Sequence, residues 1–245
     1  MANLFIPLPV ALQNAQFIKN NTTVYTVFYF HVYTPLRFLS RVSPDLRETT
    51  FRMWSFKDMA IKPNTDAYIQ NGILKYKSVE VVKEFTYELV SAISKIIAQQ
   101  FKSKKIKNIV LLAVPPSVKN KKSTMLACIS VIAGQIAKDG SVKRMNYFRN
   151  KNILNGGTVL ERIVDVNTSH LTGKNTNTYD DLWNSLNVNR NQIPSGCKSD
   201  ETGYILLDDV VTTGLNMAVC KDRLVQSGLI SDNIVCLAIS KTEYP

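Results

Sequence analysis

The stretch Tyr204–Gly214, YILLDDVVTTG, decides the fold. A run of apolar residues leads into two adjacent carboxylates, and two further apolar residues lead into Thr-Thr-Gly. An uninterrupted apolar run bounded by turn residues is typical of a buried parallel strand. Beyond Gly214 the apolar residues recur at helical spacing, and Gly228 indicates where that helix ends. The stretch therefore predicts a strand, a tight loop and a helix.

The loop of this unit has the chemistry of a phosphate site. Backbone amides near Thr212, Thr213 and Gly214 would lie at a helix N-terminus, which favours an anion. Asp208 and Asp209 come just before, where carboxylates are suited to accept hydrogen bonds from sugar hydroxyls or to balance a metal. A phosphate at one end and hydroxyls at the other describe a sugar phosphate. The alternative is a buried strand that ends in an acidic turn.

The segment ILLDDVVTTG resembles, nearly residue for residue, the phosphoribosyl pyrophosphate (PRPP) motif of type I phosphoribosyltransferases. In that family two acids hold the ribose 2′- and 3′-hydroxyls, and the Thr-Thr-Gly loop cradles the 5′-phosphate. The resemblance implies that Asp208 and Asp209 are the catalytic, ribose-binding acids. It assigns the 5′-phosphate, mostly through backbone amides, to Val211, Thr212, Thr213, Gly214, Leu215 and Asn216. Many members have a threonine where this chain has Asn216, whose amide can still donate to a phosphate.

A second strand, loop and helix precede the first in the sequence. The apolar run 108–114, NIVLLAV, predicts a buried strand, and apolar spacing over 123–138 predicts a helix. In type I phosphoribosyltransferases the loop between the corresponding elements binds the pyrophosphate of PRPP. The resemblance therefore assigns that group to Pro116, Ser117, Val118 and Lys119, and nearby lysines add charge. The alternative is a plain surface connection.

Periodicity and turn residues predict the remaining elements. An apolar stripe predicts a long helix over 78–100, and β-branched and aromatic residues predict a strand over 23–33. The weaker predictions are a short helix near 11–19, a loop or hairpin over 61–77, a strand over 142–148, a short helix and a turn over 178–190, and a last strand over 232–240.

The region 150–200 is rich in Asn, Thr, Ser and Gly. Such a composition indicates a mobile flap, and the family uses a flap of this kind to close over PRPP. Arg149, His170 and Lys174 are the candidate cations of the flap or of the diphosphate side. The alternative for each is a solvated surface residue.

Composition limits the class of protein. Hydrophobic residues make up 45% of the 245 residues, enough for a core, and no apolar run approaches the roughly 20 residues of a membrane span. The four cysteines are scattered without a C-x-x-C pair, so neither a zinc ribbon nor a disulfide scaffold is indicated. The first residues lack the basic segment of a signal peptide. We expect a cytoplasmic protein with no membrane contact.

The net charge of +11 favours anionic ligands and a weak nucleic-acid or protein partner, the alternative being a lysine-rich solvated surface. We predict an α/β fold, a Rossmann-like parallel sheet flanked by helices. Residues 76–245 form the phosphoribosyltransferase-like domain, and residues 1–75 form a hood over its carboxyl edge or an assembly region. A Tyr…Pro-Leu-Arg segment and a later Phe-Lys pair resemble the start of the ComF-like branch of the family, without its zinc ribbon.

The resemblance implies an enzyme that binds PRPP with Mg²⁺ and transfers the phosphoribosyl group to a nitrogen acceptor, releasing pyrophosphate. No residue is predicted as a direct metal ligand. The alternative is a sensor or effector with weak or no catalysis that binds a nucleotide or nucleic acid, as in bacterial antiphage modules of the retron type or in competence systems. Dimers are common in the family, and the sequence leaves the oligomeric state and the acceptor open.

Overall fold

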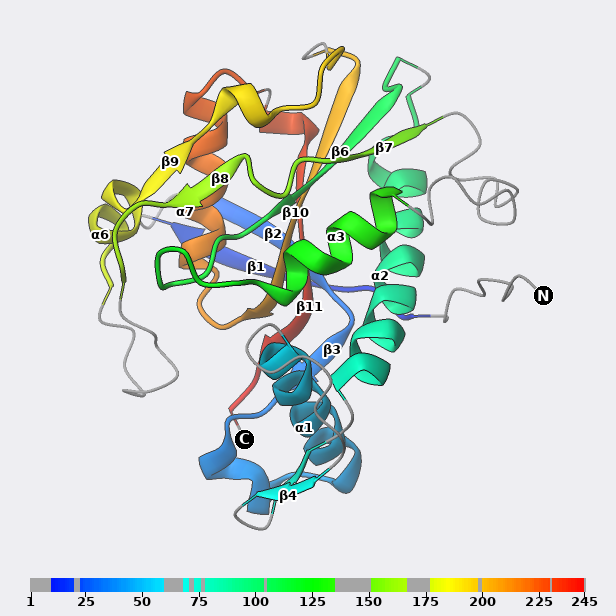
Figure 1. Cartoon of the computed structure of the whole chain (residues 1–245), viewed down its shortest axis with the longest axis vertical. Coiled ribbons are helices and arrows are strands. Elements are labelled where there is room, and N and C mark those ends of the chain that lie inside the picture. The colour runs from blue at the N-terminus through cyan, green and yellow to red at the C-terminus, as the bar shows by residue number, and fades with distance from the viewer. Residues whose placement is uncertain are drawn as a thin grey trace, which may run out of the picture.

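The computed structural model describes residues 10–19, 23–59, 68–70, 73–75, 78–103, 105–134, 151–166, 177–197, 200–229 and 231–244. These residues form an α/β structure around a seven-stranded mixed sheet (Figure 1). The strand order is β1-β2-β11-β10-β6-β7, and β3 pairs with a further part of β11. The strands are β1 (Gln13–Lys19), β2 (Thr23–Tyr29), β3 (His31–Tyr33), β6 (Asn108–Ala113), β7 (Asn152–Asn155), β10 (Thr202–Val211) and β11 (Ile234–Thr242). All pairings are parallel except that of β1 with β2.

Helices cover both faces of the sheet. On one face lie α2 (Ser78–Gln100) and α3 (Thr124–Gly134), and α1 (Pro44–Met59) packs against α2 beyond the carboxyl ends of the strands (Figure 1). On the other face lie α6 (Tyr179–Asn184) and α7 (Leu215–Gln226). Alternate strand residues supply the two cores: Leu111 and Ile205 pack on the α2 side, and Leu112 and Leu206 pack on the α7 side. Burial on both faces explains why β6 and β10 are apolar without alternation.

The chain leaves β6 and β10 in opposite directions along the sheet. From β6 it passes through α3 to β7 at one edge, and from β10 it passes through α7 to β11 on the other side. Because α3 and α7 lie on opposite faces, the two connections diverge above the carboxyl ends of β6 and β10. A divergence of this kind is where open α/β sheets bind their ligands.

Smaller elements complete the described chain. Two short antiparallel pairs are β4 (Tyr68–Gln70) with β5 (Ile73–Lys75), and β8 (Leu160–Arg162) with β9 (Leu186–Val188). Short 3₁₀ helices are η1 (Leu36–Arg41), η3 (Arg190–Gln192) and η4 (Ser231–Asn233). The first pair confirms a hairpin in the region 61–77.

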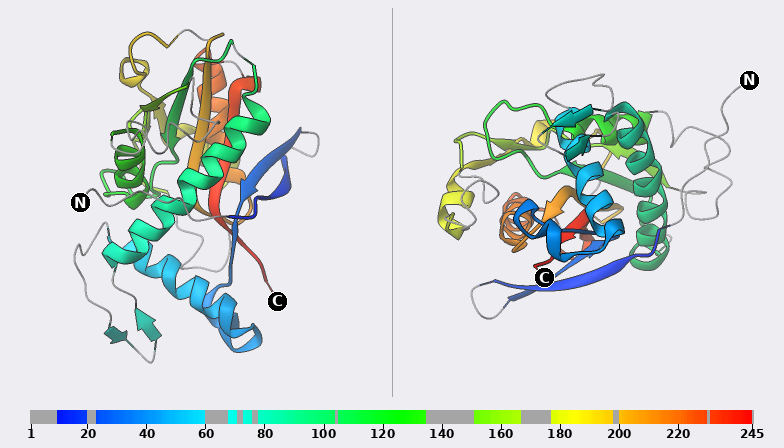
Figure 2. Two further views of the ribbon diagram at one scale, coloured as in Figure 1. Left: turned by 90° about the vertical axis from the view of Figure 1, so that its right-hand side faces the viewer. Right: turned by 90° about the horizontal axis from the view of Figure 1, so that it is seen from below.

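The N-terminal third joins the main sheet. The prediction divides the chain after residue 75, yet β1, β2 and β3 belong to the same sheet as the C-terminal strand β11 (Figure 2). The predicted helix near 11–19 is wrong, because residues 13–19 pair along their whole length with β2. Seen from below, α1 lies across the carboxyl ends of the strands, the place predicted for a hood.

Most predicted elements in the described chain are confirmed. The helix over 78–100 has the predicted ends, and the predicted strand 23–33 is interrupted only at Phe30. The short helix near 178 starts with a capping box between Thr178 and Asp181, but the expected turn after it contains strand β9. The predicted flap includes β7, β8, α6 and β9. The predicted strand 142–148 lies outside the described residues, as do Arg149, His170 and Lys174.

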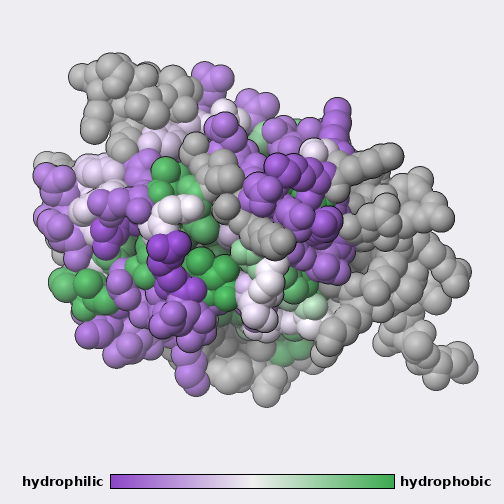
Figure 3. Space-filling view, turned by 90° about the horizontal axis from the view of Figure 1, so that it is seen from above, coloured by the Kyte–Doolittle hydropathy of each residue, from purple (hydrophilic) through white to green (hydrophobic). Residues whose placement is uncertain are grey.

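The amino-terminal ends of the strands lie opposite the carboxyl edge described above. There Lys105 pairs with Asp200 at 3.1 Å and Lys107 pairs with Glu201 at 2.9 Å, on side chains that are largely exposed. The upper end of the molecule in Figure 1 faces the viewer in Figure 3, where hydrophilic side chains predominate. Among the described helices, none is both long and apolar enough to cross a membrane.

Candidate functional site

A cavity of about 290 Å³ opens at the carboxyl ends of β6 and β10. Its walls are the loop after β6, the residues from Asp208 to Met217, the end of α1 at Phe56 and Lys57, and the start of α3. The volume is near the lower end of the range of small-molecule sites, about 300–1,000 Å³. The cavity therefore joins the two loops that the sequence predicts to bind phosphate and pyrophosphate.

The start of α7 forms one side of this cavity. Gly214 is the N-cap residue with φ +74°, and because it has no side chain it cannot cap the helix. The N–H groups of a first helical turn have no carbonyl partner within the helix, so they can face an anion. In α7 the first of them, that of Leu215, makes a long bond of 3.4 Å to Thr213 Oγ1. A Cβ at Gly214 would lie 2.5 Å from Cγ of Phe17, which packs against the loop from β1. Glycine is thus required by both conformation and space.

The two acids differ in their surroundings. Asp209 is paired with Lys57, with 3.4 Å between Oδ2 and Nζ, and both side chains are 30% exposed. Its Oδ1 also accepts the N–H of Val210, and Oδ1 of Asp208 accepts the N–H of Asp209. Burial, and next to it the charge of Asp209, raise the pKa of Asp208 well above its ordinary range. The charged form of Asp208 is therefore disfavoured, whereas the charge of Asp209 is compensated by Lys57.

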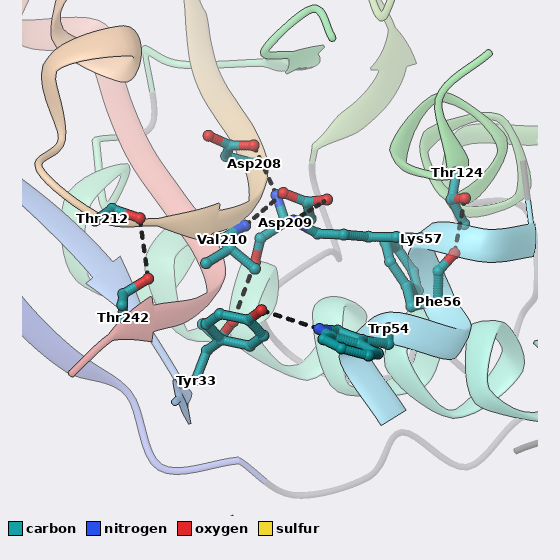
Figure 4. A network of polar contacts seen from close by, with 11 residues as sticks. Tyr33, Trp54, Phe56, Lys57, Thr124, Asp208, Asp209, Val210, Thr212 and Thr242 are labelled. Carbon is teal, nitrogen blue, oxygen red and sulfur yellow. Dashed lines mark hydrogen bonds and ion pairs between the residues drawn. The ribbon is translucent and has the colours of Figure 1, made fainter. Parts of the chain in front are cut away.

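Lys57 is a site residue that the sequence prediction did not assign. It projects from the end of α1 toward Asp209 (Figure 4). Burial lowers its pKa, but the nearby charges, Asp209 first, outweigh burial and raise the pKa overall. Two contacts hold this end of α1: Thr124 donates to the carbonyl of Phe56 at 2.9 Å, and Trp54 Nε1 donates to the Tyr33 hydroxyl at 2.9 Å. The only sequence signal is the Phe-Lys resemblance noted above.

The loop after β6 contributes part of its predicted set. Pro116 and Ser117 line the cavity, together with Lys121 and Lys122 beyond them. Val118 and Lys119 are not part of the lining: the Val118 side chain is 39% exposed, and the Lys119 N–H donates to Asp165. Of the predicted pyrophosphate loop, only the first half, Pro116 and Ser117, therefore forms a wall of the cavity.

Arg162 lies behind this wall and was also missed. Its side chain is 6% exposed. The guanidinium donates to the carbonyls of Pro115 and Pro116, to Ser185 Oγ and to Asn216 Oδ1. Burial lowers the pKa of Arg162, with smaller opposing effects from Cys220 and Asp208. The sequence offers one signal for its burial. Arg162 follows the apolar Leu160 by two residues in a short strand, so both side chains lie on the same, buried face.

Among the described residues that line the cavity, the carboxylates Asp208 and Asp209 are the charged oxygen ligands for a metal. No cluster of three or more His, Cys, Asp or Glu side chains suited to a metal occurs in the described ranges. Mg²⁺ is commonly held by one or two carboxylates together with phosphate oxygens and water. Asp208 and Asp209 fit that arrangement for a metal that arrives with a phosphorylated ligand.

No protein-family model matches the chain, and no curated protein matches its sequence. What the site can do therefore follows from its own groups. The start of α7 offers N–H donors, Asp208 and Asp209 offer acceptors for hydroxyls, and Lys121 and Lys122 add positive charge across the cavity. Such a set suits a sugar that carries phosphate at both ends.

Proposed function

We propose that the protein binds PRPP with Mg²⁺ and transfers the phosphoribosyl group to a nitrogen acceptor, releasing pyrophosphate, as a protein with the type I phosphoribosyltransferase fold. One observation supports this most directly: the two acids, the first turn of α7 and the loop at Pro116 and Ser117 line a single cavity. The cavity lies where the connections from β6 and β10 diverge, as expected of an α/β ligand site.

In this proposal each part of PRPP has a partner. The 5′-phosphate lies at the start of α7, and the ribose hydroxyls donate to Asp208 and Asp209. The pyrophosphate lies against Ser117, Lys121 and Lys122. Asp208 and Asp209 would also hold the Mg²⁺, which would supply charge balance for the departing pyrophosphate.

The chemistry requires positioning and electrostatics from the protein. The bond between ribose C1 and the pyrophosphate oxygen breaks, and its electron pair leaves with pyrophosphate. The lone pair of the acceptor nitrogen forms the new bond to C1, and the nitrogen then loses a proton to solvent. Donors at Ser117, Lys121 and Lys122 stabilise the leaving group, and the α7 turn holds the sugar in line. No side chain has to act as a nucleophile.

A second candidate function is ligand binding without transfer. Lys57 neutralises Asp209, one of the two acids that the enzyme would use for ribose or metal. A lysine held there favours a site that binds a nucleotide or sugar phosphate as a signal. The same cavity would then control a protein or nucleic-acid partner.

Incubation with PRPP, Mg²⁺ and a panel of nucleobases and amines, scored by pyrophosphate release, separates these functions. The Asp208→Asn, Asp209→Asn double variant removes two charge-assisted hydrogen bonds, at a cost on the order of 3 kcal/mol, or more than a hundredfold in affinity for PRPP. Asp200→Asn, at the other end of the sheet, is the matched control and should bind like the wild type.

The outcomes are distinct. Calorimetric binding of PRPP with pyrophosphate release supports the enzyme, and binding without release from any acceptor supports the signal-binding protein. No binding of PRPP or ribose 5-phosphate by the wild type at millimolar concentration would exclude both. Unchanged affinity in the double variant would mean that these acids do not hold ribose.

A further inference from the structure

Arg162 joins elements that are far apart in the chain. It lies on β8, yet its guanidinium contacts the loop after β6, the end of α6 and the first turn of α7. The bond to Ser185 Oγ is 2.6 Å, that to Asn216 Oδ1 is 3.0 Å and that to the Pro116 carbonyl is 3.1 Å. One rigid, planar group therefore connects the two walls of the cavity from behind.

Packing alone does not account for this arginine. No carboxylate of the described residues lies within 4 Å of its guanidinium, and every acceptor that it contacts is neutral. A buried charge without an ion-pair partner is costly, and an apolar residue of similar volume is often at least as stable. Asp208 opposes the effect of burial on the pKa of Arg162 only in part. The position of the charge, behind an anion-binding wall, gives it a use that a buried apolar side chain would not have.

The contact with Pro116 orients the loop after β6. In a planar trans peptide the C=O and the following N–H point in opposite directions. Because the Pro116 carbonyl faces Arg162, the Ser117 N–H points away from the guanidinium, and Ser117 lines the cavity. Pro115 and Pro116 have no N–H, and the Val114 N–H is bonded to Leu207 in the sheet. Ser117 is thus the first backbone donor that the loop can offer an anion.

The contact with Asn216 orients the other wall in the same way. A guanidinium only donates, so the amide oxygen of Asn216 must face it, and the amide NH₂ is directed elsewhere. Asn216 belongs to the first turn of α7 and lines the cavity. Its NH₂ group is therefore placed as a side-chain donor beside the backbone donors of that turn.

We propose that Arg162 is a positioning residue that fixes one anion donor on each wall, so that the two loops act as a single site for a ligand with a phosphate at one end and a pyrophosphate at the other. The buried positive charge between the loops also reduces the repulsion between two bound anions. The inference rests on the proposed function in one respect, that the cavity takes PRPP. It adds that the preference for PRPP over pyrophosphate or ribose 5-phosphate, each of which reaches only one wall, depends on a residue outside the cavity.

The test compares Arg162→Met and Arg162→Lys with the wild type by calorimetry, using PRPP, pyrophosphate and ribose 5-phosphate well below each melting temperature. In the wild type PRPP binds more tightly than pyrophosphate. In Arg162→Met the ratio of the affinity for PRPP to the affinity for pyrophosphate falls tenfold or more. Arg162→Lys recovers only part of it, because an ammonium lacks the planar fork that reaches both walls. The exposed Arg190→Met is the matched control for charge and leaves the advantage intact.

Nuclear magnetic resonance signals of the two donors provide a readout that would not change if Arg162 served packing alone. In the wild type, PRPP, which reaches both walls, shifts the Ser117 amide signal and the Asn216 side-chain NH₂ signals together. Arg162→Met weakens both shifts, whereas Ser117→Ala keeps them because it retains the N–H. If a folded Arg162→Met keeps the wild-type ratio of affinities and the wild-type signal shifts, the inference alone is overturned. If Arg162→Met does not fold, an Arg162→Lys variant with the full wild-type ratio of affinities overturns it. A wild type that binds none of the three ligands would overturn the proposed function as well.

Discussion

At the residue scale, two adjacent aspartates have opposite effects on stability. The pKa of Asp208 is raised by burial and by Asp209, whereas Asp209 is paired with Lys57. Between its ordinary pKa and the raised one, folded Asp208 keeps a proton that the unfolded chain loses. Stability therefore falls as pH rises through that window. Because asparagine does not titrate, Asp208→Asn should be more stable than the wild type at pH 7, by roughly 0.5–2 kcal/mol.

Melting curves from pH 3 to pH 8 check this prediction. The advantage of Asp208→Asn should vanish toward pH 3, where both states of the wild type are protonated. Asp209→Asn is the control and should be slightly less stable than the wild type at pH 7, since a partly exposed ion pair contributes about 0–1 kcal/mol. Equal effects of the two substitutions would contradict the different environments described for them.

The site residues that could be predicted from the sequence lie close to one another in the chain. Asp208, Asp209 and Gly214 stand within one strand, loop and helix, and the structure places all three at one cavity. Lys57 and Arg162 act on partners that are distant in the chain, and a lone lysine or arginine is most often a surface residue. Only the three-dimensional pairing reveals them.

At the scale of elements, β1 supports the loop that starts α7. Phe17 fills the space beside Gly214, so Gly214→Ala has two costs: roughly 1–2 kcal/mol for the left-handed conformation and about 1–3 kcal/mol for overpacking. Gly196→Ala is a matched control, because Gly196 has φ +79° and no atom within 4 Å of its added Cβ. We expect Gly214→Ala to lose more stability than the control, and to lose PRPP affinity as well.

Chemical denaturation of both variants, with PRPP titration, measures these effects. The double variant Phe17→Ala, Gly214→Ala should be more stable than the sum of the single effects predicts, since the clash is shared. Additive effects, or equal losses for Gly214→Ala and Gly196→Ala, would show that Phe17 does not restrict the loop.

Elements with a strong pattern of their own were predicted well. The apolar stripe of α2 and the continuous apolar runs of β6 and β10 fix their type without reference to neighbours. β1 carries only Ala15 and Phe17 on alternate positions, too few to distinguish strand from helix. Its structure comes from pairing with β2, which overrides a weak local preference.

At the scale of the whole molecule, the net charge of +11 should draw anions to the protein without specifying a sequence. We expect weak binding to any nucleic acid, most of which is lost between about 50 and 200 mM salt. Gel shifts with unrelated oligonucleotides over this range measure it, with PRPP calorimetry in the same buffers as the comparison. Binding that selects one sequence and survives the higher salt would indicate a dedicated nucleic-acid surface.

The order of strands in the sheet also has a consequence for how the chain matures. β2 and β3 take their parallel partners from β11, so that Val27 pairs with Cys236 and Val32 pairs with Lys241. During synthesis the β1–β2 hairpin leaves the ribosome long before β11 exists, and until then it has no sheet to join. Contacts between such distant segments form slowly, because a long loop must close first. The central sheet can therefore be completed only after β11 has been made, and the β1–β2 hairpin that carries Phe17 to the α7 loop joins the sheet only then.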